Sequence, residues 1–146
     1  MHQQNLSWVT AGKALSKILI VDQDARWART TALRLRASGY DVQTVPGAHE
    51  ASAVVFRMRP DLIILDADAP IYSGFEFHEC LQTMKRGKDI PIVYVSARNS
   101  WVSREVARRQ QAAAFLTKPV ETSVLLDAVH HVLAPSLHQE RRVNVS

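Results

Sequence analysis

Asp66 is the residue whose surroundings point most clearly to chemistry. It follows a wholly apolar run, residues 62–65, which lies between Pro60 and Pro70. A short apolar run of this kind is typical of a buried strand in a parallel sheet. In open α/β sheets, functional groups gather beyond the carboxyl ends of such strands. The sequence therefore places Asp66 where a nucleophilic carboxylate would act.

Three other apolar segments also end in residues with useful polar groups. Residues 18–21 are followed by Asp22, residues 92–95 by Ser96, and residues 114–117 by Lys118 and Pro119. In one parallel sheet, these ends would bring two carboxylates, a hydroxyl and an ammonium to a single edge. A carboxylate can form an acyl phosphate, a hard cation would neutralise the crowded oxygens, and the hydroxyl and ammonium could bind them. The set therefore suits phosphoryl transfer.

The rest of the chain supplies the elements that must hold these strand ends in place. Strands and helices alternate, which predicts an α/β fold: a doubly wound, flavodoxin-like, five-stranded parallel sheet with five helices and right-handed crossovers. Asp24 is expected to cap the first helix, and Gly39 to follow it in a left-handed conformation. The expected helices cover residues 24–38, 47–59, 74–86, 100–111 and 121–134, and the second strand covers residues 40–45.

With this order and spacing, the chain resembles the receiver domain of two-component response regulators, of the single-domain type, over roughly residues 16–134. The resemblance rests on residues 18–22, on Asp66 with Pro70 and Gly74 after it, and on the segments 91–97 and 115–119. It implies that Asp66 accepts a phosphoryl group from a histidine kinase or a histidine phosphotransfer protein. It also implies a signalling domain rather than an enzyme.

The resemblance assigns roles to the residues around Asp66. Asp22 and Asp66, with the backbone or side chain of Asp68, would hold Mg²⁺. Ser96 would be the switch hydroxyl, Lys118 the phosphate partner and Phe115 the rotating aromatic. Phosphorylation would then reshape the face formed by the fourth helix, the fifth strand and the fifth helix, which would control an unidentified protein partner or form a homodimer.

One position departs from the family pattern. Most receivers carry two adjacent acids after the first strand, whereas here Gln23 follows Asp22, and this neutral amide predicts weaker magnesium binding. Asp68 could restore negative charge near the cation, or it could form a salt bridge with Arg98. In the family, these two positions tune how fast the phosphate is lost.

Two other functions compete with the phosphorylation switch. A phosphorylation-independent adaptor would keep the fold and bind partners through its basic surface, with Gln23 as the mark of a weakened metal site. A phosphatase of the haloacid-dehalogenase type would use Asp66 and Asp68 as nucleophile and general acid. That family normally places the pair on an early strand, and here two strand and helix units precede it.

Composition agrees with one domain. The chain has 146 residues, 47% of them hydrophobic, which is the usual size of a single domain. We expect residues 1–15 to be a flexible extension, residues 16–134 the receiver domain and residues 135–146 a tail or linker. The sequence shows no apolar run of membrane-spanning length and no signal-peptide pattern, and Cys80 is the only cysteine, so a cytoplasmic location is expected.

The charge balance bears on partners. The formal net charge is +4 and the isoelectric point is near 9.6. Several arginines gather around the fourth helix close to Trp101, a combination that could dock an acidic protein. Nucleic-acid binding is not expected, because no reading motif is visible.

Overall fold

The computed structural model describes residues 15–68, 74–98 and 101–134. Five parallel strands form one sheet in the order β2-β1-β3-β4-β5. The predicted fold class is confirmed. The expectations for the extension and the tail fall outside these residues, apart from Leu15.

The elements are β1 (Lys17–Val21), α2 (Ala25–Ala37), β2 (Asp41–Val45), α3 (Ala48–Met58), β3 (Leu62–Asp66), α4 (Gly74–Gln82), the short 3₁₀ helix η1 (Gly87–Asp89), β4 (Ile92–Ser96), α5 (Trp101–Arg109), β5 (Ala114–Thr117) and α6 (Thr122–Leu133).

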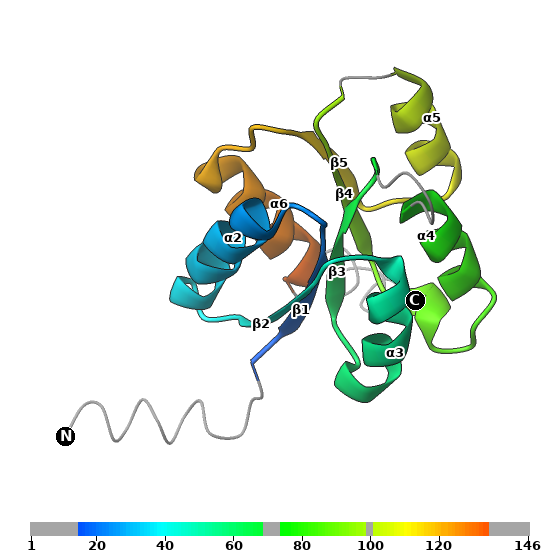
Figure 1. Cartoon of the computed structure of the whole chain (residues 1–146), viewed down its shortest axis with the longest axis horizontal. Coiled ribbons are helices and arrows are strands. Elements are labelled where there is room, and N and C mark those ends of the chain that lie inside the picture. Colours follow the sequence, from blue (N-terminus) through cyan, green and yellow to red (C-terminus); the bar gives the residue numbers. More distant parts are fainter. Residues whose placement is uncertain (1–14, 69–73, 99–100, 135–146) are drawn as a thin grey trace, which may run out of the picture.

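The helices cover both faces of the sheet. Figure 1 shows α2 and α6 on one side and α3, α4 and α5 on the other. The core is divided in the same way, because alternate residues of each strand point to opposite faces. Ile18 and Ile20 pack with Leu35 of α2, whereas Leu19 and Ile63 pack in the cluster that holds Phe77 of α4. Both faces of β1, β3 and β4 are thus buried, which explains their continuous apolar runs.

The first helix begins and ends as its sequence predicts. The Asp24 side chain accepts a hydrogen bond from the backbone N–H of Trp27, at 3.1 Å, and so caps α2. Gly39 follows the helix with a φ of 96°, in the left-handed region that glycine enters without strain. The chain can then turn directly into β2.

The third predicted helix is shorter than expected. The sequence predicts a helix over residues 74–86, but α4 ends at Gln82. The N–H groups of Thr83 and Met84 bond to carbonyls three residues back, and the Thr83 hydroxyl also donates to the carbonyl of Cys80. These bonds tighten the last turn and compete with a further α-helical turn. Other boundaries differ from the predictions by one or two residues.

No helix in the described part of the chain has both the length and the hydropathy that crossing a membrane requires.

Candidate functional site

The sheet register brings the predicted strand ends together. Val21 is paired with Leu65, so Asp22 and Asp66 follow side by side, and Ser96 is paired with Thr117, directly before Lys118. The N–H of Lys118 donates to the carbonyl of Ser96 at 2.7 Å. The four side chains therefore leave neighbouring strands at one edge of the sheet, as the sequence predicts.

Asp66 is nearly enclosed. Its residue is only 6% exposed, and its Oδ1 accepts a hydrogen bond from the backbone N–H of Asp68 at 2.9 Å. Burial raises the pKa of the Asp66 carboxyl above its usual range, the Asp68 N–H bond opposes this, and the nearby Asp22 charge adds to it. A carboxylate in such surroundings gains from a partner that neutralises its charge.

Lys118 and Asp22 form a buried ion pair beside Asp66. The Lys118 ammonium donates to Asp22 Oδ2 at 2.8 Å, and the two side chains are 16% and 1% exposed. The other oxygen of Asp22 accepts from the backbone N–H of Asp24 at 2.9 Å. The same ammonium lies 4.6 Å from the centre of the Trp27 ring. Lys118 is thus held by a carboxylate and an aromatic face at once.

Ser96 is fully buried, and its hydroxyl bonds to Asp68. The distance from Ser96 Oγ to Asp68 Oδ1 is 2.7 Å, shorter than the 3.0 Å to the carbonyl oxygen of Arg98. The backbone N–H of Ala97 donates to the second oxygen of Asp68, also at 2.7 Å. The Asp68 carboxylate therefore bridges the end of β4 and the turn after β3.

Asp68 and Arg98, the two tuning positions, have different surroundings. Within the described segments, no ion pair joins Asp68 to Arg98, and the two Asp68 oxygens accept hydrogen bonds from Ser96 and Ala97. Arg98 is exposed, and so is Gln23, which follows the buried Asp22. The expected salt bridge between Asp68 and Arg98 is thus absent from the described residues, while the other expected role of Asp68, negative charge near a cation, stays a prediction.

Phe115 lies half-buried at the face that the resemblance assigns to output. Its ring centre is 4.9 Å from the Arg104 guanidinium, and Arg104 also donates to the Thr117 hydroxyl at 2.8 Å. On its other side, Phe115 lies 6.3 Å from the ring of Tyr94. Arg104 of α5 thus covers Phe115 and links α5 to β5.

Sequence reasoning missed a buried polar network behind this face. His78 of α4 bonds to the Tyr94 hydroxyl at 2.8 Å, and that hydroxyl donates to Gln110 Oε1 at 3.2 Å. Gln82 adds a bond to the carbonyl of Gln110 at 2.7 Å. The available sequence signal was the spacing of His78 and Gln82, four residues apart on one helix. That spacing does not identify Tyr94 or Gln110 as their partners.

The comparisons with known proteins agree with this geometry. The chain matches the family model of the response regulator receiver domain over residues 18–130. The chain belongs to this family. Receiver domains are signalling domains of two-component systems, and the resemblance inferred from the strand ends is confirmed.

Relatives and solved structures extend the comparison. The response regulator MprA of Mycobacterium leprae is 32% identical over 117 residues, which cover 80% of this receiver and 50% of that protein. The DNA-binding dual master transcriptional regulator RpaA of Synechocystis is 29% identical, with coverage of 82% and 49%. The chemotaxis protein CheY4 of Vibrio cholerae has 29% identity and a TM-score of 0.77, with coverage of 82% of this chain and 100% of that one. The receiver thus spans about half the length of these two curated relatives.

The acidic edge of this receiver fits a divalent cation in part. The carboxylates of Asp22, Asp66 and Asp68 are close enough for the first and third to raise the pKa of the second. In the described residues, however, no three acidic or histidine side chains are grouped as metal ligands. Asp68 is instead bonded to Ser96 and Ala97, and Asp22 is paired with Lys118. The donor chemistry suits Mg²⁺, which receivers generally bind, and these bonds compete with it.

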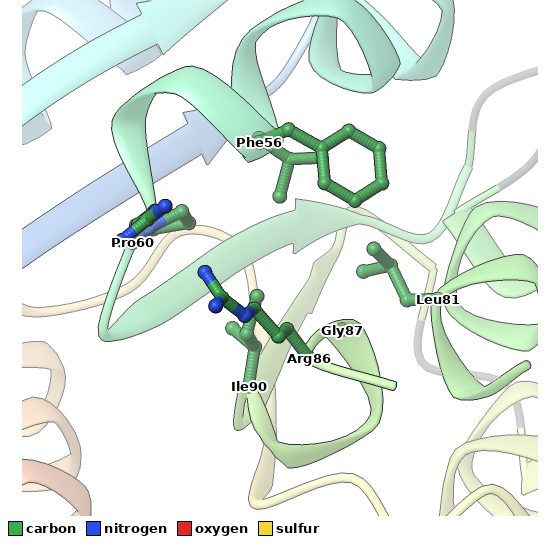
Figure 2. A pocket seen from close by; sticks show the side chains of 8 residues that line it. Phe56, Pro60, Leu81, Arg86, Gly87 and Ile90 are labelled. Atoms are coloured by element: carbon green, nitrogen blue, oxygen red, sulfur yellow. The ribbon is translucent and has the colours of Figure 1, made fainter. Parts of the chain in front are cut away.

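A pocket of about 260 Å³ lies elsewhere in the receiver. Figure 2 shows Phe56 above it and Arg86 and Ile90 below it. It is lined by the end of α3, by Pro60 before β3 and by the segment before β4, so it lies toward the amino ends of the strands. Because Asp66 and Ser96 lie at the carboxyl ends of the same strands, this pocket is separate from the candidate site.

Proposed function

We propose that this receiver domain accepts a phosphoryl group on Asp66 from a phosphohistidine of a histidine kinase or a histidine phosphotransfer protein. The observation that carries the proposal is the position of Asp66: a nearly enclosed carboxylate between a buried lysine–aspartate pair and a buried serine hydroxyl. Those are the groups that an anionic acyl phosphate requires. Exchange with such a donor would take place in the cytoplasm.

The transfer balances without a further reactant. An oxygen of the Asp66 carboxylate attacks phosphorus, the phosphorus–nitrogen bond of the donor histidine breaks, and the released imidazole takes up a proton. Attack by water on the phosphorus of the acyl phosphate returns Asp66 and inorganic phosphate. Lys118 and Ser96 would bind the transferred oxygens as charge and hydroxyl donors. Both lie at strand ends beside Asp66, as this requires.

Magnesium would be held by the carboxylates of Asp22 and Asp66 and by the backbone carbonyl of Asp68. Its contribution when bound is to neutralise charge on the phosphoryl oxygens. Gln23 offers an amide where most receivers offer an acid, so we expect weak binding. If Asp22 turned from Lys118 toward such a cation, the lysine would be free to meet the phosphoryl group.

The output surface would be the face formed by α5, β5 and α6. It carries exposed apolar side chains, with Trp101 77% and Val102 55% exposed on α5 and Val124 46% exposed on α6. It also carries Arg108 and Arg109, which make this surface basic even though both contact Glu105. We propose that it binds an acidic protein partner or a second copy of the domain.

Intact mass spectrometry after incubation with acetyl phosphate tests the proposal. We expect a gain of one phosphoryl group that depends on magnesium and is absent in Asp66→Asn. Asp127→Asn is the matched control, because it removes an exposed carboxylate on α6 and leaves the site untouched. A wild-type protein that gains no mass at high magnesium would contradict the proposal for small-molecule donors and favour the phosphorylation-independent adaptor.

Partner specificity needs a separate measurement. Size-exclusion chromatography with light scattering, before and after phosphorylation, would detect a homodimer. Trp101→Ala should abolish it, whereas Phe56→Ala, which changes an exposed aromatic on α3 outside the proposed output surface, should not. A monomer under both conditions would leave the acidic protein partner as the proposed output.

A further inference from the structure

The end of β4 forms a pair of hydrogen-bond donors that already holds an anion. The Ser96 hydroxyl and the Ala97 N–H each donate to a different oxygen of Asp68, both at 2.7 Å. Bonds of this length from neutral donors to a carboxylate are charge-assisted and stronger than bonds between neutral groups. The two donors therefore bind a negatively charged group of the chain itself.

The position of this carboxylate is fixed from both sides. The N–H of Asp68 donates to Asp66 Oδ1 at 2.9 Å, so the turn after β3 is tied to the phosphoacceptor. The Asp68 side chain reaches Ser96 and Ala97 at the end of the neighbouring strand, β4. Ser96 is fully buried and has a single hydroxyl hydrogen, and the acceptors within its reach are Asp68 Oδ1 at 2.7 Å and the Arg98 carbonyl at 3.0 Å. While that hydrogen serves the nearer Asp68, it cannot serve a further acceptor. One residue thus connects Asp66 with both donors.

We propose that the Asp68 carboxylate is an internal stand-in for the phosphoryl group: it occupies the Ser96 and Ala97 donors until a phosphoryl group on Asp66 displaces it. This inference rests on the proposed phosphorylation of Asp66. Asp68 is then a positioning residue that holds the switch hydroxyl turned toward the site before any phosphate arrives. It acts through Ser96 and Ala97 and not on the reacting phosphorus.

Two consequences follow for this receiver. The unphosphorylated protein has its switch hydroxyl in the inward position, so the change on phosphorylation is smaller at Ser96 than in a receiver with a neutral residue in place of Asp68. Phosphorylation is also slower, because the incoming group must replace a charge-assisted bond and approach a second carboxylate. Replacing Asp68 with alanine should raise the phosphorylation rate by about tenfold, the effect of losing one such competing bond.

Amide exchange measured by NMR, without phosphate donor or magnesium, tests the contact itself. In Asp68→Ala, the Ala97 N–H should exchange with water at least about tenfold faster than in the wild type. Asp61→Ala is the matched control: Asp61 Oδ2 accepts from the N–H of Lys17, also at 2.7 Å, so this variant should speed exchange at Lys17 and leave Ala97 unchanged. Equal Ala97 exchange in wild type and Asp68→Ala would overturn the proposal.

The phosphorylation rate tests the competition. Wild type, Asp68→Ala and Asp68→Asn are each incubated with acetyl phosphate and followed by intact mass. Asp68→Asn keeps the shape of the side chain and one acceptor oxygen, so its phosphorylation rate should lie between those of the wild type and Asp68→Ala. If Asp68→Ala gains phosphate no faster than the wild type, the stand-in role is wrong. If no protein gains phosphate, the proposed function fails, whereas the exchange result still decides whether Asp68 holds the donors.

Discussion

At the scale of single residues, the Tyr94 hydroxyl fixes the protonation of a buried histidine. Tyr94 has one hydrogen, which it donates to Gln110 Oε1, so the 2.8 Å contact with His78 requires the proton to be on His78 Nδ1. The other ring nitrogen then accepts from Gln82 Nε2 at 3.4 Å. The four side chains form one directed chain of bonds that suits a neutral imidazole. Burial lowers the pKa of His78, and the side-chain hydrogen bond with Gln110 opposes this in part.

The first prediction concerns stability at mildly acidic pH. Below its ordinary pKa of about 6.5, His78 binds a proton in the unfolded chain but resists it in the folded chain, so the free energy of unfolding falls as the pH drops below that value. We expect urea unfolding at pH 7.5 and pH 5.5 to show a smaller pH effect in His78→Asn than in the wild type. The exposed His131→Asn is the control and should retain the full effect. Equal pH effects in wild type and His78→Asn would contradict the assignment.

Residue types at strand ends made much of the candidate site predictable. Asp22, Asp66, Ser96 and Lys118 each follow an apolar run, and parallel strands bring their carboxyl ends to one edge. The bonds between them were not predictable. Asp68 lies in a turn, and whether its carboxylate meets Arg98 or the end of β4 depends on turn geometry that residue types do not encode.

At the scale of elements, Gly74 lets α4 begin against β3. A Cβ built at Gly74 would overlap the backbone carbonyl of Asp66 and would lie 3.0 Å from the Leu65 side chain. Both neighbours belong to the strand that carries the phosphoacceptor. The missing side chain therefore sets how closely the start of α4 approaches Asp66.

The second prediction follows from this contact. Gly74→Ala should lower the free energy of unfolding by about 1–3 kcal/mol, as overpacking does, and should slow phosphorylation because the strand end shifts. Gly47→Ala is the matched control: its Cβ would lie 3.4 Å from the flexible Glu50 side chain and overlap nothing, so we expect only the loss of a favourable N-cap residue of α3, at about 0.5–1 kcal/mol. Denaturant titration measures both. A Gly74→Ala protein as stable as Gly47→Ala would show that the start of α4 shifts without cost.

Helix boundaries illustrate how far local signals reach. Asp24 caps the start of α2 and Gly39 follows its end, and both features were predicted. The end of α4 at Gln82 was not predicted, because no glycine or proline follows it closely. The Thr83 hydroxyl bonds to the carbonyl of Cys80 there and competes with a further helical turn. Likewise, Arg104 could be placed on a helix from the sequence, but its contact with Phe115 needed the register of α5 against β5.

At the scale of the whole molecule, the proposed magnesium binding would be linked to folding. Burial disfavours the charge of the Asp66 carboxyl and raises its pKa, and a cation that binds only the folded chain would offset this cost. The sheet order puts β1 and β3 side by side at the centre, so the acidic edge forms only when the complete sheet is assembled. Magnesium should therefore stabilise the entire domain and not one loop.

The third prediction tests this link and the role of Gln23. Magnesium at ten times its Kd should raise the free energy of unfolding of the wild type by about 1.4 kcal/mol. Gln23→Asp should bind magnesium on the order of tenfold more tightly, because it restores a carboxylate ligand, and should be less stable than the wild type without metal. Thermal unfolding across a magnesium titration measures both effects.

Gln43→Asp is the control for added charge. It introduces the same carboxylate on the exposed side of the edge strand β2, away from the strand end. It should leave the magnesium response unchanged. If Gln23→Asp responds to magnesium as Gln43→Asp does, the amide at position 23 is not what limits metal affinity.

The contact between the Lys118 ammonium and the Trp27 ring gives the domain an optical reporter of its own state. Indole emission is sensitive to a cation 4.6 Å from the ring, and under the proposed function Lys118 would leave Asp22 to meet a phosphoryl group or to make way for a metal. With Trp8 and Trp101 replaced by phenylalanine, the remaining fluorescence would follow that lysine in real time. Both ligand binding and phosphotransfer would then be visible without any attached dye.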